Sequence, residues 1–196
     1  MMGTDLLLVR HGQTDWNVEG RYQGQDGPGL NEAGRAQAEA VARELAVARP
    51  DALFSSDLPR ALETAQIIGR TVGLSVQLEP RLREIHQGIW QGMLYSDIQQ
   101  RYGEALRRFR EDPLHSPPPG GETLAQLKAR ITAALDDIAA RSPASRVIVV
   151  THKLPIALLR CMEAGCPFDR VWQMIPGNAQ VITLHWPLER AAAAGQ

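Results

Sequence analysis

Short, continuous apolar runs alternate along this chain with longer segments whose apolar residues recur every three or four positions. A strand that is buried on both faces has no polar side, so the runs predict strands at Leu6–Val9, Ala52–Phe54, Val76–Leu78, Val147–Val150 and Val181–Leu184. The helical spacing predicts helices at Asn31–Arg49, from Pro59 to Val72, at Glu122–Arg141 and at Leu154–Met162. This alternation predicts an α/β fold, a three-layer sandwich whose mostly parallel central sheet is flanked by helices.

The pattern weakens between residues 84 and 121. Glycines and the run Pro117–Gly121 interrupt two short predicted helices, near Tyr95–Arg101 and Glu104–Glu111. We interpret residues 84–121 as a small insertion of helices and loops that caps the active site, and residues 1–196 as a single domain. The alanine-rich residues 191–196 are predicted to form a frayed tail.

Charged and titratable side chains follow three of the predicted strands. Arg10 and His11 come directly after the first strand, Arg60 follows the second through Ser55-Ser56-Asp57, and His152 follows Val147–Val150 through one threonine. Ligands of an open parallel sheet bind outside the carboxyl ends of its strands. The three segments therefore predict one positively charged pocket that suits a phosphate dianion.

Composition excludes several other classes of function. The formal net charge of −1 creates no global attraction to nucleic acid or to an anionic membrane, and no stretch is long and apolar enough to span a bilayer. The N-terminus lacks the pattern of a secretory signal. Cys161 and Cys166 have no histidine nearby to complete a zinc site, so we expect two free thiols in a reducing, cytoplasmic location. The sequence is compatible with a homodimer.

A series of motifs, in a fixed order over nearly the whole chain, resembles the histidine phosphatase superfamily, which includes the cofactor-dependent phosphoglycerate mutases. The motifs are Leu8–Thr14 with Asn17 and Gly20–Gly24, Leu30–Gly34, Ser55–Ala61, Leu82–Glu84 with Gly88–Gly92, Pro119–Thr123, Val150–His152 and Pro176–Ala179. One Arg-His-Gly tripeptide is a weak signal, whereas the ordered set is specific. The resemblance implies an enzyme that transfers a phosphoryl group.

The resemblance assigns roles to five residues. His11 is the expected nucleophile, because neutral imidazole carries a lone pair near pH 7 and can form phosphohistidine. Arg10 and Arg60 present planar donor forks to the phosphate oxygens. His152 would pair with His11 around the phosphate and stabilise charge in the transition state. Glu84 would protonate the leaving group and then deprotonate water.

Two further groups of residues surround this expected centre. By resemblance Thr14, Asn17, Gln23 and Gly24 bind the phosphoryl group as substrate-binding residues, although turn and cap formation is a competing role for Thr14. Bulky side chains of the insertion either line the mouth of the pocket or form a small satellite core; they are Trp90, Met93, Tyr95, Tyr102 and Phe109.

Lys153 departs from the family pattern, which usually has glycine after the second histidine. A lysine here either reaches the pocket, where it favours a more anionic substrate, or points away along its helix. A Cβ would be strained if the backbone needed a positive φ at this position.

The segment after Glu84 separates a phosphatase from a mutase. Mutases typically carry an Arg-Arg-Tyr-Tyr type segment there, whereas this chain has Ile85–Gly92. We therefore expect water to be the acceptor and a phosphomonoester to be hydrolysed without metal or other cofactor. The candidates are a broad-specificity phosphatase, an α-ribazole phosphate phosphatase and a sugar or glycerate phosphate phosphatase. The alternatives are a cofactor-dependent phosphoglycerate mutase and a non-catalytic protein that binds a phosphate ligand on the same fold.

Overall fold

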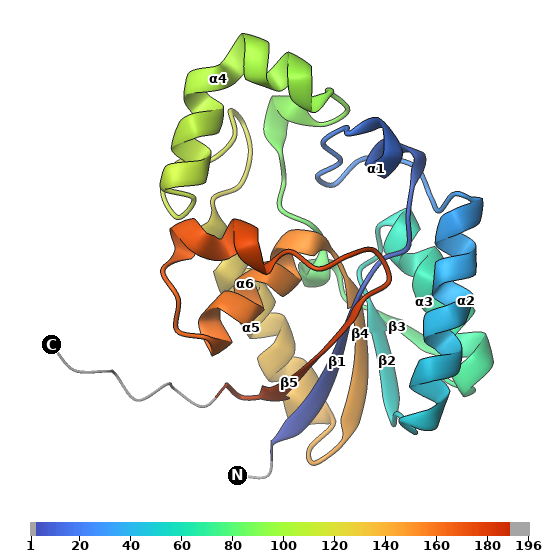
Figure 1. Cartoon of the computed structure of the whole chain (residues 1–196). Coiled ribbons are helices and arrows are strands. Elements are labelled where there is room, and N and C mark those ends of the chain that lie inside the picture. Colours follow the sequence, from blue (N-terminus) through green and yellow to red (C-terminus); the bar gives the residue numbers. More distant parts are fainter. Residues whose placement is uncertain (1–2, 189–196) are drawn as a thin grey trace, which may run out of the picture.

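A five-stranded sheet forms the centre of the computed structural model, which describes residues 3–188 (Figure 1). The strand order is β3-β2-β4-β1-β5. Four strands are parallel: β1 (Thr4–Arg10), β2 (Ala52–Ser55), β3 (Val76–Leu78) and β4 (Arg146–Thr151). The last strand, β5 (Val181–Trp186), runs antiparallel to β1. The predicted strands and the mostly parallel sheet are thus confirmed.

Helices connect and cover the strands. They are α1 (Asp15–Glu19), α2 (Glu32–Val47), α3 (Pro59–Val72), α4 (Tyr95–Glu111), α5 (Leu124–Arg141) and α6 (Lys153–Glu163), with 3-10 turns η1 (Pro80–Leu82), η2 (Gly88–Trp90) and η3 (Phe168–Met174). Asn31 caps α2 as predicted, because its side-chain oxygen accepts from the Gly34 amide at 2.9 Å. Thr123 caps α5, so this helix starts two residues later than the sequence predicted.

The sheet separates two apolar layers. Along β1, Leu6 and Leu8 pack into the core formed with α5 and α6, whereas Leu7 and Val9 pack into the core formed with α2 and α3. Successive side chains of a strand point to opposite faces, so a continuous apolar run fills both cores. Figure 1 shows α2 and α3 on one face and α5 and α6 on the other. The predicted three-layer sandwich is confirmed.

Beyond the carboxyl edge of the sheet, α4 extends across the top of the molecule (Figure 1). The sequence predicted two short helices here, and the structure has one element from Tyr95 to Glu111 with a kink at Tyr102, whose φ is −133°. Gly103 weakens the helix at this point but does not end it. Helix α1 was not predicted from the sequence, because its five residues are too few to show an apolar stripe.

The expectation of two free thiols is wrong in this structure, which joins Cys161 and Cys166 in a disulfide. Helix α6 ends at Glu163, and Gly165 adopts a φ of +61° that turns the chain back. The turn leaves the two Cα atoms 5.2 Å apart, within the range that a disulfide spans.

Among residues 3–188, no helix has the length and apolar character needed to cross a membrane. The predicted tail at 191–196 lies outside the described residues.

Candidate active site

The parallel pairing of three strands brings the predicted residues to one edge of the sheet. Arg10 of β1 is aligned with Thr151 of β4, and the His11 amide donates to the Thr151 carbonyl at 3.0 Å. On the other side of β4, the Ser56 amide donates to the Val150 carbonyl at 3.0 Å. The residues that follow β1, β2 and β4 therefore lie side by side, as the sequence predicted.

Hydrogen bonding fixes the His11 ring in one tautomer. Nδ1 lies 2.7 Å from the Gly12 carbonyl, which can only accept, so Nδ1 carries the proton. Nε2 is then unprotonated and accepts from Nε of Arg60 at 3.2 Å. Burial lowers the pKa of His11 well below its ordinary value, and the cations of Arg60 and Arg10 lower it further. His11 is therefore neutral at pH 7, with a lone pair on Nε2.

Two glycines allow the loop after β1 to pack directly on the first turn of α2. A Cβ on Gly12 would lie 2.4 Å from the Gly34 carbonyl oxygen, and a Cβ on Gly34 would lie 2.0 Å from the Gln13 carbonyl oxygen. Neither contact is possible for a larger residue without a backbone shift. The Gly12 amide also donates to the Thr64 hydroxyl at 3.1 Å, which ties the same loop to α3.

Arg60 is a fully buried cation near the start of α3. Its Nη1 donates to the Asp26 carbonyl at 2.8 Å and its Nη2 to the Gly24 carbonyl at 2.7 Å, so its fork is held by backbone. Burial lowers the pKa of Arg60 to about 10, which leaves the guanidinium charged at neutral pH. Arg10 is held in the same way, with Nη1 donating to the Pro176 carbonyl at 2.7 Å.

His152 lies beside His11, with the two ring centroids 5.2 Å apart. Its Nε2 lies 2.9 Å from the Ser56 hydroxyl, a contact that the sequence analysis did not anticipate. Burial lowers the pKa of His152 well below its ordinary value, with a further contribution from Arg60. Three buried side-chain nitrogens have no hydrogen-bond partner among residues 3–188: Nδ1 of His152, Nε of Arg10 and, in the core, Nε1 of Trp90. A buried donor without a partner is costly, so Nδ1 of His152 and Nε of Arg10 are suited to bind an anion at this edge of the sheet.

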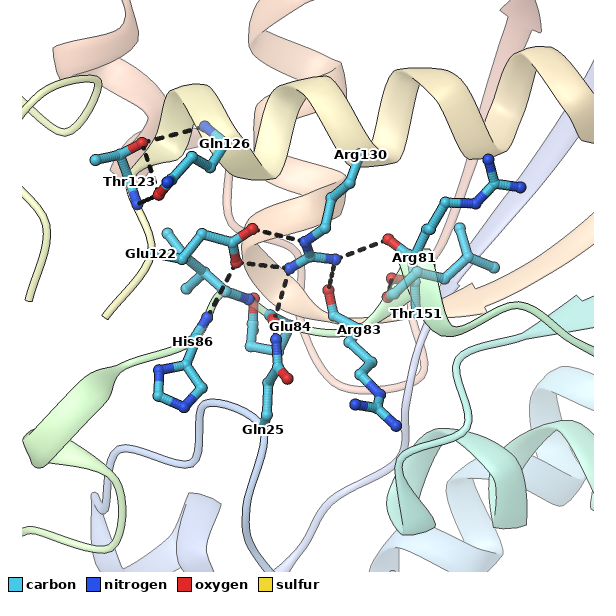
Figure 2. Close-up of polar contacts among 12 residues, drawn as sticks. Gln25, Arg81, Arg83, Glu84, His86, Glu122, Thr123, Gln126, Arg130 and Thr151 are labelled. Atoms are coloured by element: carbon cyan, nitrogen blue, oxygen red, sulfur yellow. Dashed lines mark hydrogen bonds and ion pairs between the residues drawn. The ribbon is translucent and has the colours of Figure 1, made fainter. Parts of the chain in front are cut away.

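Glu84 is buried at the end of the segment that follows η1, and its Oε1 accepts from the Ile85 amide at 3.0 Å. Two side chains hold its backbone carbonyl, Nε2 of Gln25 at 3.1 Å and Nη2 of Arg130 at 2.9 Å (Figure 2). The position of the carboxyl group is therefore set from outside the segment that carries it.

Arg130 of α5 supports this whole segment (Figure 2). Its Nη1 donates to the carbonyls of Arg81 at 2.7 Å and Arg83 at 2.6 Å, and it is paired with the Glu122 carboxylate at 2.7 and 2.8 Å. The irregular segment 81–84 leaves these carbonyls without strand partners, and buried carbonyls need donors. Neither Arg130 nor Glu122 is among the site residues predicted from the sequence.

A small cavity of about 30 Å³ lies among these side chains. It is lined by Arg10, His11, Asn17, Arg21, Tyr22, Gln23, Gly24, Arg60, Glu84, Gln87 and Lys153. A second cavity of about 450 Å³ is lined by Tyr22, Gln87, Phe109, Arg110, Lys153, Leu154, Trp172 and Ile175. Three residues line both, so the two cavities adjoin.

The four predicted substrate-binding residues differ in where they lie. Asn17, Gln23 and Gly24 line the small cavity, and Thr14 does not. The Thr14 hydroxyl accepts from the Asn17 amide at 3.2 Å and donates to Oε1 of Gln23 at 3.1 Å, which makes Thr14 the N-cap of α1. Capping therefore occupies the Thr14 side chain, and its contact with a phosphoryl group stays a prediction.

The bulky residues of the insertion are divided between core and cavity. Trp90 is fully buried in the core and packs edge to face on Phe109 with centroids 5.9 Å apart. Of the five residues singled out in the sequence, only Phe109 lines the larger cavity. Tyr22 and Trp172, which line it as well, were missed because only tertiary packing brings the loop after α1 together with α4 and η3.

Lys153 is the first residue of α6 and lines both cavities. Its φ is not positive, so the Cβ of Lys153 causes none of the backbone strain considered above. Of the two orientations left open by the sequence, the side chain has the one that reaches the pocket.

Comparisons with known proteins agree with this geometry. The family model of the histidine phosphatase superfamily (branch 1) matches residues 6–194. Phosphoserine phosphatase 1 of Hydrogenobacter thermophilus is 36% identical over 180 residues, which cover 92% of this chain and 85% of that protein. Glucosyl-3-phosphoglycerate phosphatase of Mycobacterium tuberculosis is 41% identical over 218 aligned residues, which cover 100% of this chain and 97% of that protein.

Solved structures lead to the same family. The mycobacterial glucosyl-3-phosphoglycerate phosphatase in complex with VO3 superposes with a TM-score of 0.85 at 36% identity, over 95% of this chain and 94% of that one. The ordered motifs, the paired histidines at the sheet edge and these matches lead to one conclusion: the chain belongs to the histidine phosphatase superfamily, branch 1.

Proposed function

We propose that the protein hydrolyses small-molecule phosphomonoesters in two steps through a phosphohistidine at His11. The orientation of the His11 ring carries this proposal. Nδ1 donates its proton to the Gly12 carbonyl, which leaves the Nε2 lone pair beside the cation of Arg60. A phosphoryl group drawn in by Arg10 and Arg60 therefore meets an unprotonated nucleophile.

In the first step the Nε2 lone pair of His11 attacks phosphorus and the P–O bond to the alcohol breaks. The leaving oxygen takes a proton from the Glu84 carboxyl group, so a neutral alcohol departs. Arg10, Arg60 and His152 donate to the three oxygens that share the developing charge, and their positions are set before the substrate arrives. This role uses Nδ1 of His152 and Nε of Arg10, which are both buried and have no hydrogen-bond partner among residues 3–188.

In the second step a water molecule attacks the phosphorus of phosphohistidine. The Glu84 carboxylate accepts a proton from the water, the N–P bond breaks, and its electrons return to Nε2 of His11. Orthophosphate leaves, and both residues regain their starting protonation states. One carboxyl group thus serves as acid and then as base, which is why its fixed position beside the small cavity supports the proposal.

The relatives support a phosphorylated metabolite as the substrate. Two of them are named as phosphatases of phosphoserine and of glucosyl-3-phosphoglycerate. Both compounds carry a carboxylate near the phosphate-bearing carbon. Water rather than a second alcohol is the expected acceptor, because both named activities are hydrolytic.

Hydrolysis of 4-nitrophenyl phosphate at pH 7 tests the proposal, together with acid-labile ³²P labelling of the protein by a labelled substrate. Wild-type protein should release phosphate and become labelled transiently, and His11→Ala should lose both properties. His115→Ala is a matched control, because the His115 side chain is 75% exposed and lies outside the site. Hydrolysis or labelling that survives in His11→Ala would overturn the phosphohistidine mechanism.

The same preparation distinguishes the alternative activities. Incubation with 3-phosphoglycerate should give orthophosphate and no 2-phosphoglycerate, whereas a mutase would interconvert the two acids. A wild-type protein that binds orthophosphate but hydrolyses none of a broad panel of monoesters would be the non-catalytic phosphate-binding protein instead.

A further inference from the structure

Lys153 occupies the junction between the small cavity and the larger one beside it. Its ammonium nitrogen lies 5.5 Å from the centroid of the Tyr22 ring. The Tyr22 ring stacks on the Tyr95 ring with centroids 6.2 Å apart, and the Arg110 guanidinium lies 5.3 Å from the centroid of Tyr95. Two cations therefore lie against a stacked pair of tyrosines, of which Tyr22 lines the larger cavity.

The charges of Lys153 and Arg110 are not balanced within this wall. Neither residue takes part in any ion pair among residues 3–188, and no carboxylate lines the larger cavity. Much of its remaining lining is apolar, as at Phe109, Leu154 and Trp172. Apolar walls reduce the local dielectric constant and strengthen the attraction of these cations for an anion. Burial lowers the pKa of Lys153, and the Glu84 carboxylate opposes only part of this shift, so a bound anion would relieve the remaining cost of burying the charge.

The start of α6 adds to this positive potential. Its N-cap residue His152 makes no side-chain hydrogen bond to the first turn, and Leu154 of that turn lines the larger cavity. The N-terminus of a helix carries a partial positive charge and amide groups without intrahelical partners. Lys153 therefore lies on a helix end that itself favours an anion.

We infer that the larger cavity is a subsite for a second anionic group of the substrate, a carboxylate a few bonds from the phosphate ester oxygen, bound by Lys153 and Arg110. The inference rests on the proposed phosphatase function, since the ester must bind at His11. When the phosphoryl group is bound in the small cavity, the organic part of the substrate must extend past Tyr22, Gln87 and Lys153, the three residues that line both cavities. A carboxylate there meets the ammonium group first.

Matched substrates test the subsite. O-phosphoserine and phosphoethanolamine differ only by a carboxylate, and 3-phosphoglycerate differs from glycerol 3-phosphate by a carboxylate in place of a hydroxymethyl group. For the wild-type protein, kcat/KM should be higher for the substrate of each pair that carries the carboxylate. Lys153→Gln should lower that ratio about tenfold, the effect of one hydrogen bond to a charged group, and Lys153→Arg should largely retain it.

Lys128→Gln is the matched control. Lys128 lies on α5 against the Phe168 ring, 5.1 Å from its centroid, and lines neither of these cavities. Lys128→Gln should leave the ratio of kcat/KM values unchanged for both substrate pairs. Equal kcat/KM within either pair of wild-type measurements, or a ratio that is unchanged in Lys153→Gln, would overturn the subsite while the hydrolysis itself stands. Failure to hydrolyse all four esters and 4-nitrophenyl phosphate would instead overturn the proposed function.

Discussion

The two adjoining cavities are built differently. Around the small one, the side chains of Arg10, His11 and Arg60 are each held by backbone carbonyls. Around the larger one, Lys153 and Arg110 rest on aromatic rings and form no ion pair among residues 3–188. Donors fixed by backbone keep the geometry that phosphoryl transfer needs, whereas side chains resting on rings can be exchanged without disturbing the main chain. The small cavity is therefore built for the reaction, and the larger cavity is built for the selection of the substrate.

Arg60→Gln should have the largest effect, because it removes a donor from the reaction and a cation from beside His11. It also leaves the carbonyls of Gly24 and Asp26 without their guanidinium partner. We expect kcat/KM for 4-nitrophenyl phosphate to fall by about 10²–10³-fold. A loss below tenfold in a variant with an unchanged circular dichroism spectrum would contradict the distinction between the cavities.

Arg130→Lys should have a smaller effect that depends on the leaving group. Lysine keeps the charge but cannot reach three carbonyls and the Glu122 carboxylate together, so Glu84 should lose its fixed position. An alkyl phosphate needs a proton on its leaving oxygen, whereas 4-nitrophenolate leaves without one. We therefore expect kcat for an alkyl phosphate to fall about tenfold more than kcat for 4-nitrophenyl phosphate.

The control for this prediction is Arg107→Lys on the exposed side of α4, where Arg107 pairs with Glu104 and Glu111. It should change neither rate. A parallel loss on both substrates in Arg130→Lys would mean that Arg130 acts only through general stability.

The smallest expected effect concerns stability at low pH. The pKa values of His11 and His152 are depressed by burial, so below about pH 6.5 the unfolded chain binds protons that the folded chain does not. The free energy of unfolding should therefore fall as the pH is lowered from about 6.5 toward the folded-state pKa values. The slope should reach at most about 1.4 kcal/mol per pH unit for each histidine.

Urea titrations from pH 7.5 to 5 measure this slope. His152→Asn should flatten it, and His115→Asn, which changes an exposed histidine just after α4, should not. An equal slope in wild type and His152→Asn would show that the buried rings at the sheet edge do not control acid stability.

The sequence contains enough information to predict the strand ends and much less to predict what supports them. His11, Arg60 and His152 follow apolar runs, so the parallel sheet brings them together whatever the details of packing. Arg130 looks like an ordinary surface charge in a helical pattern, because the carbonyls that it binds belong to an irregular segment nearly fifty residues earlier. The pairing of Cys161 with Cys166 depends likewise on one turn at Gly165, which has no signature in spacing.

One helix links the two cavities: His152 caps α6 and Lys153 begins it. A rigid rotation or translation of α6 would shift both residues at once, so the preference for an organic group cannot be retuned by moving this helix without misaligning a residue of the phosphoryl pocket. Redesign of selectivity should therefore proceed by exchanging side chains at position 153 and on α4, and loop grafting near the start of α6 should be avoided. For the same reason, natural variation in substrate choice on this scaffold is expected to accumulate as point substitutions along the cavity wall.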